Sequence, residues 1–134
     1  MTAPARVAFG AELLAELPAI LEAGGYATPD LVTCTHDARD VDKTARLHDG
    51  VIVLLPAPEL TYPNPSQCTV AWSLVVVTST TGTVLEQWQR LDALLDALRR
   101  GGLPITEAIP EGQQRPDGPL LPAYVTKLTY YTKG

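Results

Sequence analysis

The chain has 134 residues, of which 46% are hydrophobic and 19% are charged, and its formal net charge is -5. This length suits one folded core rather than two, and the composition is that of a globular domain and not of a disordered segment. No lysine or arginine lies between Arg46 and Arg90, so the middle of the chain offers nothing to neutralise phosphates, and sequence-specific binding of DNA or RNA is disfavoured. We expect a single domain over residues 1–134.

The sequence shows no targeting or membrane segment. The N-terminus lacks a basic region followed by an apolar core, and no apolar run reaches the roughly 20 residues of a membrane helix. Cys34 and Cys68 are far apart and form no Cys-x-x-Cys motif, which favours reduced thiols that pack as small apolar side chains. These features predict a protein that is made in the cytoplasm and does not enter a membrane.

The first predicted element is an amphipathic helix over residues 7–23. Its apolar side chains recur at helical spacing, at Leu13, Leu14, Leu17, Ile20 and Leu21. Pro18 predicts a bend or a new helical start, and Gly24-Gly25 ends the helix. Residues 30–50 carry five acidic and three basic side chains, and they predict mostly a loop or projecting arm after a short β-like start at 31–35.

Two strands are predicted to form the centre of the sheet. Residues 51–55 are a compact apolar run, and residues 68–79 are long and rich in β-branched side chains, so the two should pair as a wide hairpin. Between them, residues 56–67 include four prolines, Pro56, Pro58, Pro63 and Pro65. Because proline removes hydrogen-bond donors from a sheet, we expect this segment to be a projecting loop and not a central strand.

A second helix is predicted over residues 83–100. Thr83 and Glu86 form a capping-box pattern, which marks the start of a helix. Apolar side chains follow on one helical face, at Val84, Trp88, Leu91, Leu95 and Leu98. Gly101-Gly102 ends this helix, as Gly24-Gly25 ends the first predicted helix. Trp88 is expected to pack in the core together with Trp72.

The remaining residues complete an α+β fold. Residues 103–109 predict a short strand, 110–119 a turn-forming loop and 120–132 the last strand. The predicted architecture is a mainly antiparallel sheet of about four strands with two helices packed on one face. The last strand carries apolar or aromatic groups on both faces, including Tyr130 and Tyr131, so it should be covered on both sides or pair with a partner chain.

The sequence offers little for catalysis. It holds no recognisable nucleophile, P-loop or dinucleotide motif, so no catalytic or cofactor-binding residues are predicted. A Cys2His2 set of zinc-ligand types exists, Cys34, His36, His48 and Cys68, but its spacing differs from structural zinc sites, and we predict no metal. A small metal-binding cytosolic enzyme that uses the first three of these residues stays open as an alternative.

The succession of elements resembles the tail terminator family of long-tailed, siphophage-type bacteriophages. The resemblance includes the leucine-rich N-terminal helix, the apolar strand 51–55, the proline-bearing connection and the strand 68–79. It continues through the helix TVLEQWQRLDALLDALRR and ends in the late strand AYVTKLTYYT. It is best over residues 51–133, and it rests on the order, length and texture of the elements.

The resemblance implies a non-enzymatic structural protein of the virion, located in the neck region of the tail. Such a protein forms a homo-oligomeric, hexameric ring that stops growth of the tail tube. One side contacts the major tail tube protein and the other a head-completion or stopper protein, while DNA passes through the lumen without sequence-specific binding. The alternative within the neck is another head-tail connector or stopper protein, usually a smaller β-barrel.

Residues for contacts between subunits are predicted on two segments. The proline-rich connection carries Glu59, Leu60 and Tyr62, which are expected to reach a neighbouring subunit or the tube. Tyr130 and Tyr131 on the last strand are expected to lie near an interface. Acidic side chains such as Asp37, Asp40 and Asp42 are hypothesised to approach the lumen and keep DNA mobile.

Overall fold

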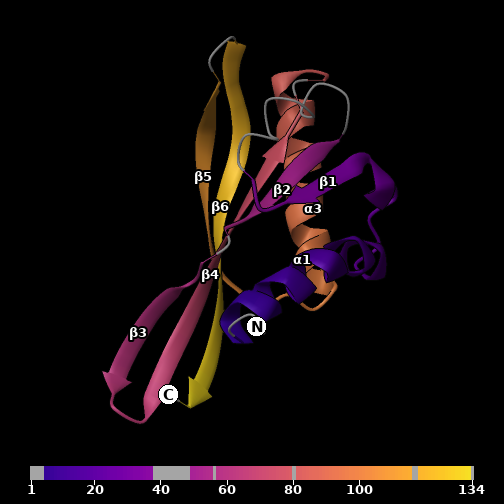
Figure 1. The fold of residues 1–134 in the computed structure, drawn as a ribbon. Helices are drawn as coiled ribbons and strands as arrows, with labels where there is room; N and C mark the ends of the chain where they lie inside the picture. Colours follow the sequence, from indigo (N-terminus) through magenta and orange to yellow (C-terminus); the bar gives the residue numbers. More distant parts are fainter. Residues whose placement is uncertain (1–4, 38–48, 56, 80, 116–117, 134) are drawn as a thin grey trace.

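A computed structural model of the protein describes residues 5–37, 49–55, 57–79, 81–115 and 118–133 (Figure 1). Within these ranges the elements are α1 (Ala5–Ala23), a short 3-10 turn η1 (Pro29–Leu31), β1 (Val32–Thr35), β2 (Gly50–Leu54), β3 (Glu59–Asn64), β4 (Gln67–Thr78), α3 (Val84–Arg100), β5 (Ile105–Arg115) and β6 (Gly118–Lys133). Neither of the described helices is long and apolar enough to cross a membrane.

The six described strands form one mixed sheet in the order β1-β2-β4-β6-β5, and β3 also pairs with β4. β1 and β2 are parallel, and all other pairs are antiparallel. β6 occupies one edge of β4 from Gln67 to Val77, so β2 and β3 share the other edge. Leu54 pairs with Leu74 and Glu59 with Ala71, so β2 and β3 lie end to end along β4.

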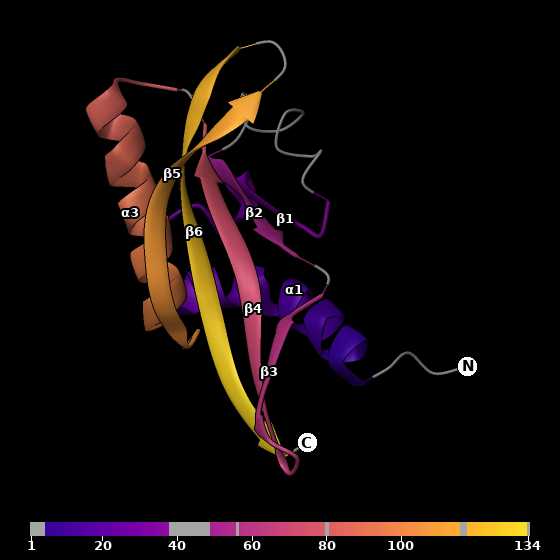
Figure 2. The same ribbon diagram turned by 90° about the vertical axis from the view of Figure 1, so that its left-hand side faces the viewer.

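Both helices pack on the same face of the sheet, as predicted (Figure 2). Alternate residues of β4 point to that face, because side chains of a strand alternate between its two sides. They join leucines of α1 and α3 in one buried cluster that includes Leu17, Leu21, Val70, Trp72, Leu74, Leu91, Leu94 and Leu98. Trp72 is 1% exposed, and its ring centroid lies 5.9 Å from that of Phe9. The core therefore lies between the helices and the middle of β4.

The two glycine pairs differ in what each glycine does. Gly25 and Gly102 have φ angles of 87° and 107°, a left-handed conformation that suits the residue after a helix. Gly24 and Gly101 instead lie where the ends of α1 and α3 meet. A Cβ atom on Gly24 would lie 1.8 Å from the carbonyl oxygen of Ala97, and one on Gly101 would lie 2.1 Å from that of Ile20. The first glycine of each pair thus allows the helix backbones to touch.

The start of α3 confirms the predicted capping box. The Thr83 side chain accepts a hydrogen bond from the backbone N–H of Glu86 at 3.2 Å. The Glu86 carboxylate in turn accepts bonds from the backbone N–H and the hydroxyl of Thr83. Arg99 and Arg100 occupy the last turn, where positive charge favours the helix dipole, and both contact Asp96.

The predicted fold class is confirmed, but two details of the sheet were wrong. The described sheet has six strands and not about four, because β1 and β3 lie in segments predicted to be mostly loop, and the β1–β2 pair is parallel. The segment 56–67, predicted to be a loop, contains the strand β3. Residues 110–115, also predicted to be loop, continue β5 through Pro110. Both β3 and β5 lie at edges of the sheet, and an edge strand tolerates proline because one side of its backbone needs no donor.

Pro18 does not interrupt the first helix. α1 runs from Ala5 to Ala23 with Pro18 inside it, and the Pro18 side is exposed while Leu17 and Leu21 are fully buried. Burial of the leucine face offsets the loss of one helical hydrogen bond at proline, which costs about 3 kcal/mol. Tertiary packing therefore decides the length of this helix.

Candidate interaction surfaces

The β3–β4 hairpin projects beyond the layer of helices and carries no charge at its tip. In Figure 1 it extends together with the C-terminal end of β6 past α1. Its turn is held by side chains: the Asn64 amide donates to Gln67 Oε1 at 2.8 Å, and the Ser66 hydroxyl donates to Asn64 Oδ1 at 2.8 Å. From Leu60 to Leu85 the sequence contains no charged residue. Beyond Glu59, which lies at its base, the hairpin is therefore a stiff, neutral and exposed surface.

The predicted interface residues Glu59, Leu60 and Tyr62 take different positions on β3. Glu59 is exposed, and Tyr62 is the most exposed aromatic side chain in the described structure, at 59%. Leu60 is half-buried and packs against the main core. Leu60 thus anchors the hairpin to its own domain, whereas Tyr62 is free to contact another molecule.

The two predicted segments come together in the sheet. Val70 of β4 pairs with Leu60 on one side and with Tyr130 on the other, and Thr69 pairs with Tyr131. The side chains of Tyr130 and Tyr131 lie outside the described residues, but their backbone positions place them two strands from β3. Residues far apart in the sequence therefore meet on one three-stranded part of the sheet, formed by β3, β4 and β6.

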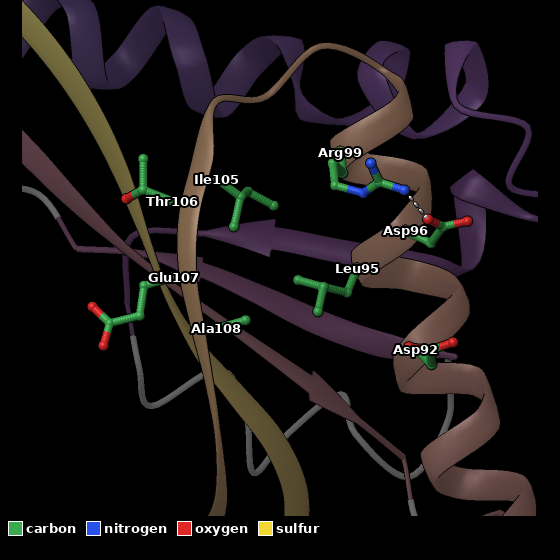
Figure 3. Close-up of a pocket in the computed structure, with 8 residues that line it drawn as sticks. All are labelled: Asp92, Leu95, Asp96, Arg99, Ile105, Thr106, Glu107 and Ala108. Atoms are coloured by element: carbon green, nitrogen blue, oxygen red, sulfur yellow. Dashed lines mark hydrogen bonds and ion pairs between the residues drawn. The ribbon is translucent and has the colours of Figure 1, made fainter.

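A groove of about 290 Å³ lies between α3 and the free edge of β5 (Figure 3). Leu95 of α3 and Ile105 and Ala108 of β5 point into the space between the two elements, and all three are partly exposed. Asp92 and Arg99 line the α3 side, while Figure 3 shows the side chains of Thr106 and Glu107 turned away from α3. The groove has an apolar floor and a charged rim, and sequence reasoning did not identify it.

Asp92 is the carboxylate in this groove that remains available. Asp96 already accepts from Arg99 at 2.9 Å and from Arg100 at 2.7 Å. Glu107 lies 3.9 Å from Lys127 on the other side of β5. Asp92 is exposed and has no ion-pair partner among the residues that the structure describes. It can therefore accept a hydrogen bond from a group that enters the groove.

The free edges of the sheet are poor templates for strand addition. β5 contains Pro110 and has irregular register between Ile105 and Glu107 and again between Gln113 and Arg115. β3 contains Pro63 and has a similar shift between Thr61 and Asn64. Prolines and bulges are common protections of edge strands, because they interrupt the row of unpaired donors and acceptors. Contacts through side chains are consequently favoured over backbone pairing at these edges.

A polar network at the other end of β4 was not expected from the sequence. The Tyr26 and Thr28 hydroxyls donate to Asp49 Oδ2 at 2.7 and 2.5 Å, and the Thr78 hydroxyl donates to the Asp49 carbonyl at 3.1 Å. Arg90 donates to the Thr78 hydroxyl at 3.0 Å. These bonds tie the loop after α1, the start of β2, the end of β4 and α3 to one another, which is a structural role.

Arg90 closes the end of β4 from the helix side. Besides Thr78, its guanidinium donates to the Ser79 hydroxyl at 3.1 Å and to the Thr81 carbonyl at 2.8 Å. Thr78 and Ser79 are buried, so these donors satisfy polar atoms that water cannot reach. Nothing in the local sequence around Arg90 predicted this role.

Tyr26 is expected to make the stability of the protein depend on pH in the alkaline range. Burial, and then the hydrogen bond and charge of Asp49, raise the pKa of Tyr26 above its ordinary value of 10.0. Above about pH 10 the unfolded chain loses this proton while the folded chain keeps it, so the free energy of unfolding falls as pH rises. We expect Tyr26→Phe to be less sensitive to alkali than the wild type, measured by urea unfolding at neutral and alkaline pH.

Cys34 provides the background for that experiment. Burial raises the pKa of its thiol from 9.0 to about 11, so it also lowers stability as pH rises through this range. In a Cys34→Ala background, the free energy of unfolding should still fall more steeply with rising pH in the chain that keeps Tyr26 than in the Tyr26→Phe chain. An identical pH profile for these two chains would contradict the role assigned to Tyr26.

The structure separates the two cysteines of the Cys2His2 set that the sequence contains. Cys34 pairs with Ile52, which pairs with Val76, and Cys68 lies 76 - 68 = 8 residues further along β4. At about 3.3 Å per residue this is roughly 26 Å, too far for one metal ion. His36 Nδ1 lies 2.8 Å from the Leu54 carbonyl oxygen, and His48, like Asp40 and Asp42, is outside the described residues. Within the described part of the chain, no group of three His, Cys, Asp or Glu side chains could hold a metal.

No protein-family model, curated protein or solved structure matches the chain. The fold and its surfaces define a class: an α+β domain with a mixed sheet, two described helices on one face, a projecting hairpin with an uncharged end and a groove at the opposite sheet edge.

Proposed function

We propose that the chain is a non-enzymatic ring subunit of a phage tail that terminates the tail tube and joins it to the neck. The observation that carries this proposal is the projecting β3–β4 hairpin, which is uncharged from Leu60 onward and exposes Tyr62 near its turn. The order of elements, which resembles that of tail terminators, supplies the particular assignment. The proposed location is the neck region of the virion.

An uncharged hairpin suits assembly from copies of an acidic protein. The chain carries a formal net charge of -5, so copies repel one another through most charged surfaces. Cores of protein interfaces are depleted in charged residues and enriched in tyrosine. Pro63 and Pro65 restrict the hairpin before it binds, which reduces the conformational entropy lost on docking. The hairpin thus combines the features expected of a contact between subunits.

The proposed partners are further copies of this chain in a hexameric ring, the major tail tube protein and a head-completion or stopper protein. DNA would pass through the ring without being read, in keeping with the acidic composition. The open sheet with two helices on one face favours a terminator-type subunit over the β-barrel that is usual for stopper proteins.

The test is native mass spectrometry and negative-stain electron microscopy of the purified protein, alone and mixed with a major tail tube protein from the same source. We expect rings, either free or formed on the end of the tube, and tubes of defined length when the protein is present. A monomer that neither forms rings nor binds the tube, at any concentration tested, would rule the proposal out.

A charge at the hairpin should prevent this assembly. Because Tyr62 is exposed, Tyr62→Glu is expected to change the free energy of unfolding by no more than about 0.5 kcal/mol. Rings should be lost all the same, as judged by native mass spectrometry. Glu16→Gln on the exposed side of α1 is the control and should assemble normally. Normal rings from the Tyr62→Glu chain would show that the hairpin is not at an interface.

A further inference from the structure

We propose that Tyr62 of one copy docks into the groove between α3 and β5 of a second copy, and that this contact repeats around the ring. The inference rests on the proposed function and deepens it, because it names the two surfaces that meet. The occupant of the groove in Figure 3 is thus the β3–β4 hairpin of a neighbouring copy.

The positions of the two surfaces in the sheet suit a head-to-tail contact. β3 pairs with one edge of β4, and β5 lies at the opposite edge of the sheet, with β4 and β6 between them. Tyr62 therefore lies at the opposite edge of the sheet from the groove of its own chain. β3 lies beside the part of β4 from Gln67 to Ala71, whereas Ile105 and Ala108 of β5 lie level with Trp72 and Leu74. A neighbouring copy that is also shifted along the strand direction brings its β3 edge against the groove, and such a contact between two different surfaces of the same chain generates a ring when its rotation closes.

Side chains, and not strand pairing, are expected to carry this contact. Pro63 and Pro110, together with the register shifts on both strands, interrupt the backbone donors and acceptors that would join β3 of one copy to β5 of the next. A protruding side chain on one edge and a groove on the other provide the alternative. Tyr62 is the exposed large side chain of the β3 edge.

The chemistry of the groove matches a tyrosine. Leu95, Ile105 and Ala108 provide an apolar floor for an aromatic ring, and Asp92 provides an available acceptor for a phenol hydroxyl. The volume of about 290 Å³ accommodates one aromatic side chain, whose burial removes roughly 150–250 Å² from water.

Charge favours a second copy as the occupant. The groove exposes the negative charge of Asp92, which would repel most surfaces of a chain with net charge -5. The hairpin is neutral from Leu60 to Gln67, and its one carboxylate, Glu59, lies at its base away from the turn, so the region around Tyr62 approaches Asp92 with little like-charge repulsion. A basic peptide would also suit one carboxylate, but it would not use the apolar floor as a tyrosine ring does.

Cross-linking tests the contact directly. A Tyr62→Cys chain mixed with an Ala108→Cys chain should give a covalent dimer with a short bis-maleimide, and a chain with both substitutions should give a ladder up to the closed ring. Each single variant alone is the control and should give neither, because Cys34 and Cys68 are the other thiols and are half-buried and buried.

Substitutions at both surfaces give a second readout by sedimentation analysis. Tyr62→Ala and Leu95→Glu should each weaken self-association by about tenfold or more, as the loss of a buried anchor does. Tyr62→Phe should weaken it less, because only the hydrogen bond to Asp92 is removed. Thr61→Ala, on the other face of β3, should have no effect.

The outcomes separate this inference from the proposed function. Rings that form without a link between positions 62 and 108 would overturn the docking contact and leave the ring subunit standing. A dimer linked through two copies of Tyr62→Cys alone would overturn the head-to-tail arrangement in favour of a two-fold contact. Absence of rings under all conditions would overturn both proposals.

Discussion

Replacing Trp72 by alanine is expected to lower the free energy of unfolding by about 3–5 kcal/mol, the range for removal of a large aromatic side chain from a core. Trp72 is 1% exposed and lies where β4 meets α1. Because small domains are stable by only about 5–15 kcal/mol, this one change should remove a large part of the stability. Urea unfolding followed by circular dichroism measures it.

Trp88 provides the matched control. It is half-buried on α3, and its ring meets that of Tyr124 edge to face at a centroid distance of 5.9 Å. Trp88→Ala should therefore cost less than Trp72→Ala, because part of its ring stays in contact with water. Equal losses for the two variants would mean that the core is not centred on Trp72.

A double-mutant cycle with Gly10 sharpens the same prediction. A Cβ atom on Gly10 would lie 2.7 Å from Trp72 Cη2, so Gly10→Ala forces the indole ring to shift. The same substitution in a Trp72→Leu chain meets no ring at that place. We expect a coupling free energy of about 0.5–3 kcal/mol between the two sites, whereas independent effects would show that the two residues do not touch.

Local patterns in the sequence were sufficient to predict the two helices and the central strands. The capping box at Thr83 and the glycines after Arg100 set the limits of α3, since helix ends depend on groups that lie within a few residues. The burial of alternate residues along β4 likewise follows from a pattern with a period of two. These elements are confirmed within one or two residues.

Other features could not be predicted because they depend on contacts between distant residues. β3 and β5 contain prolines that normally mark loops, and only their positions at sheet edges allow them to be strands. In the sequence Asp49 is one charge among several in a predicted loop, although it holds Tyr26 and Thr28, which are 23 and 21 residues away. A single sequence contains no local signal for such partners.

The candidate surfaces include one feature that the local sequence indicated and one that depends on contacts between distant residues. Glu59, Leu60 and Tyr62 were selected for their place between prolines, and the structure shows that Tyr62 is exposed while Leu60 packs inward. Leu60 and Tyr62 lie two residues apart on β3, so the alternation of a strand does not separate them. The difference comes from their places along the hairpin, because Leu60 lies nearer the core and Tyr62 nearer the turn. The groove lined by Leu95 and Ile105 lies between α3 and β5, so it depends on how these two elements pack and could not be predicted from either segment alone.

Gly24→Ala and Gly101→Ala are expected to destabilise the protein by forcing the ends of the two helices apart. The added methyl groups would lie 1.8 Å and 2.1 Å from carbonyl oxygens of Ala97 and Ile20. These are backbone atoms, so no side-chain rotation relieves the clash, and we expect a loss of about 1–3 kcal/mol or more for each variant. Thermal and urea unfolding would measure it.

The combination of these two substitutions identifies the cause. If each alanine acts by separating α1 from α3, then the first already makes room for the second, and the double variant should lose less stability than the sum of the single ones. Gly25→Asn is the control: a Cβ atom on Gly25 would meet no neighbouring atom within 4 Å, and asparagine tolerates its left-handed backbone better than other non-glycine residues do. Strict additivity for Gly24 and Gly101 would instead indicate two separate local strains, and the contact between the helix ends would then not be the reason that both positions are glycine.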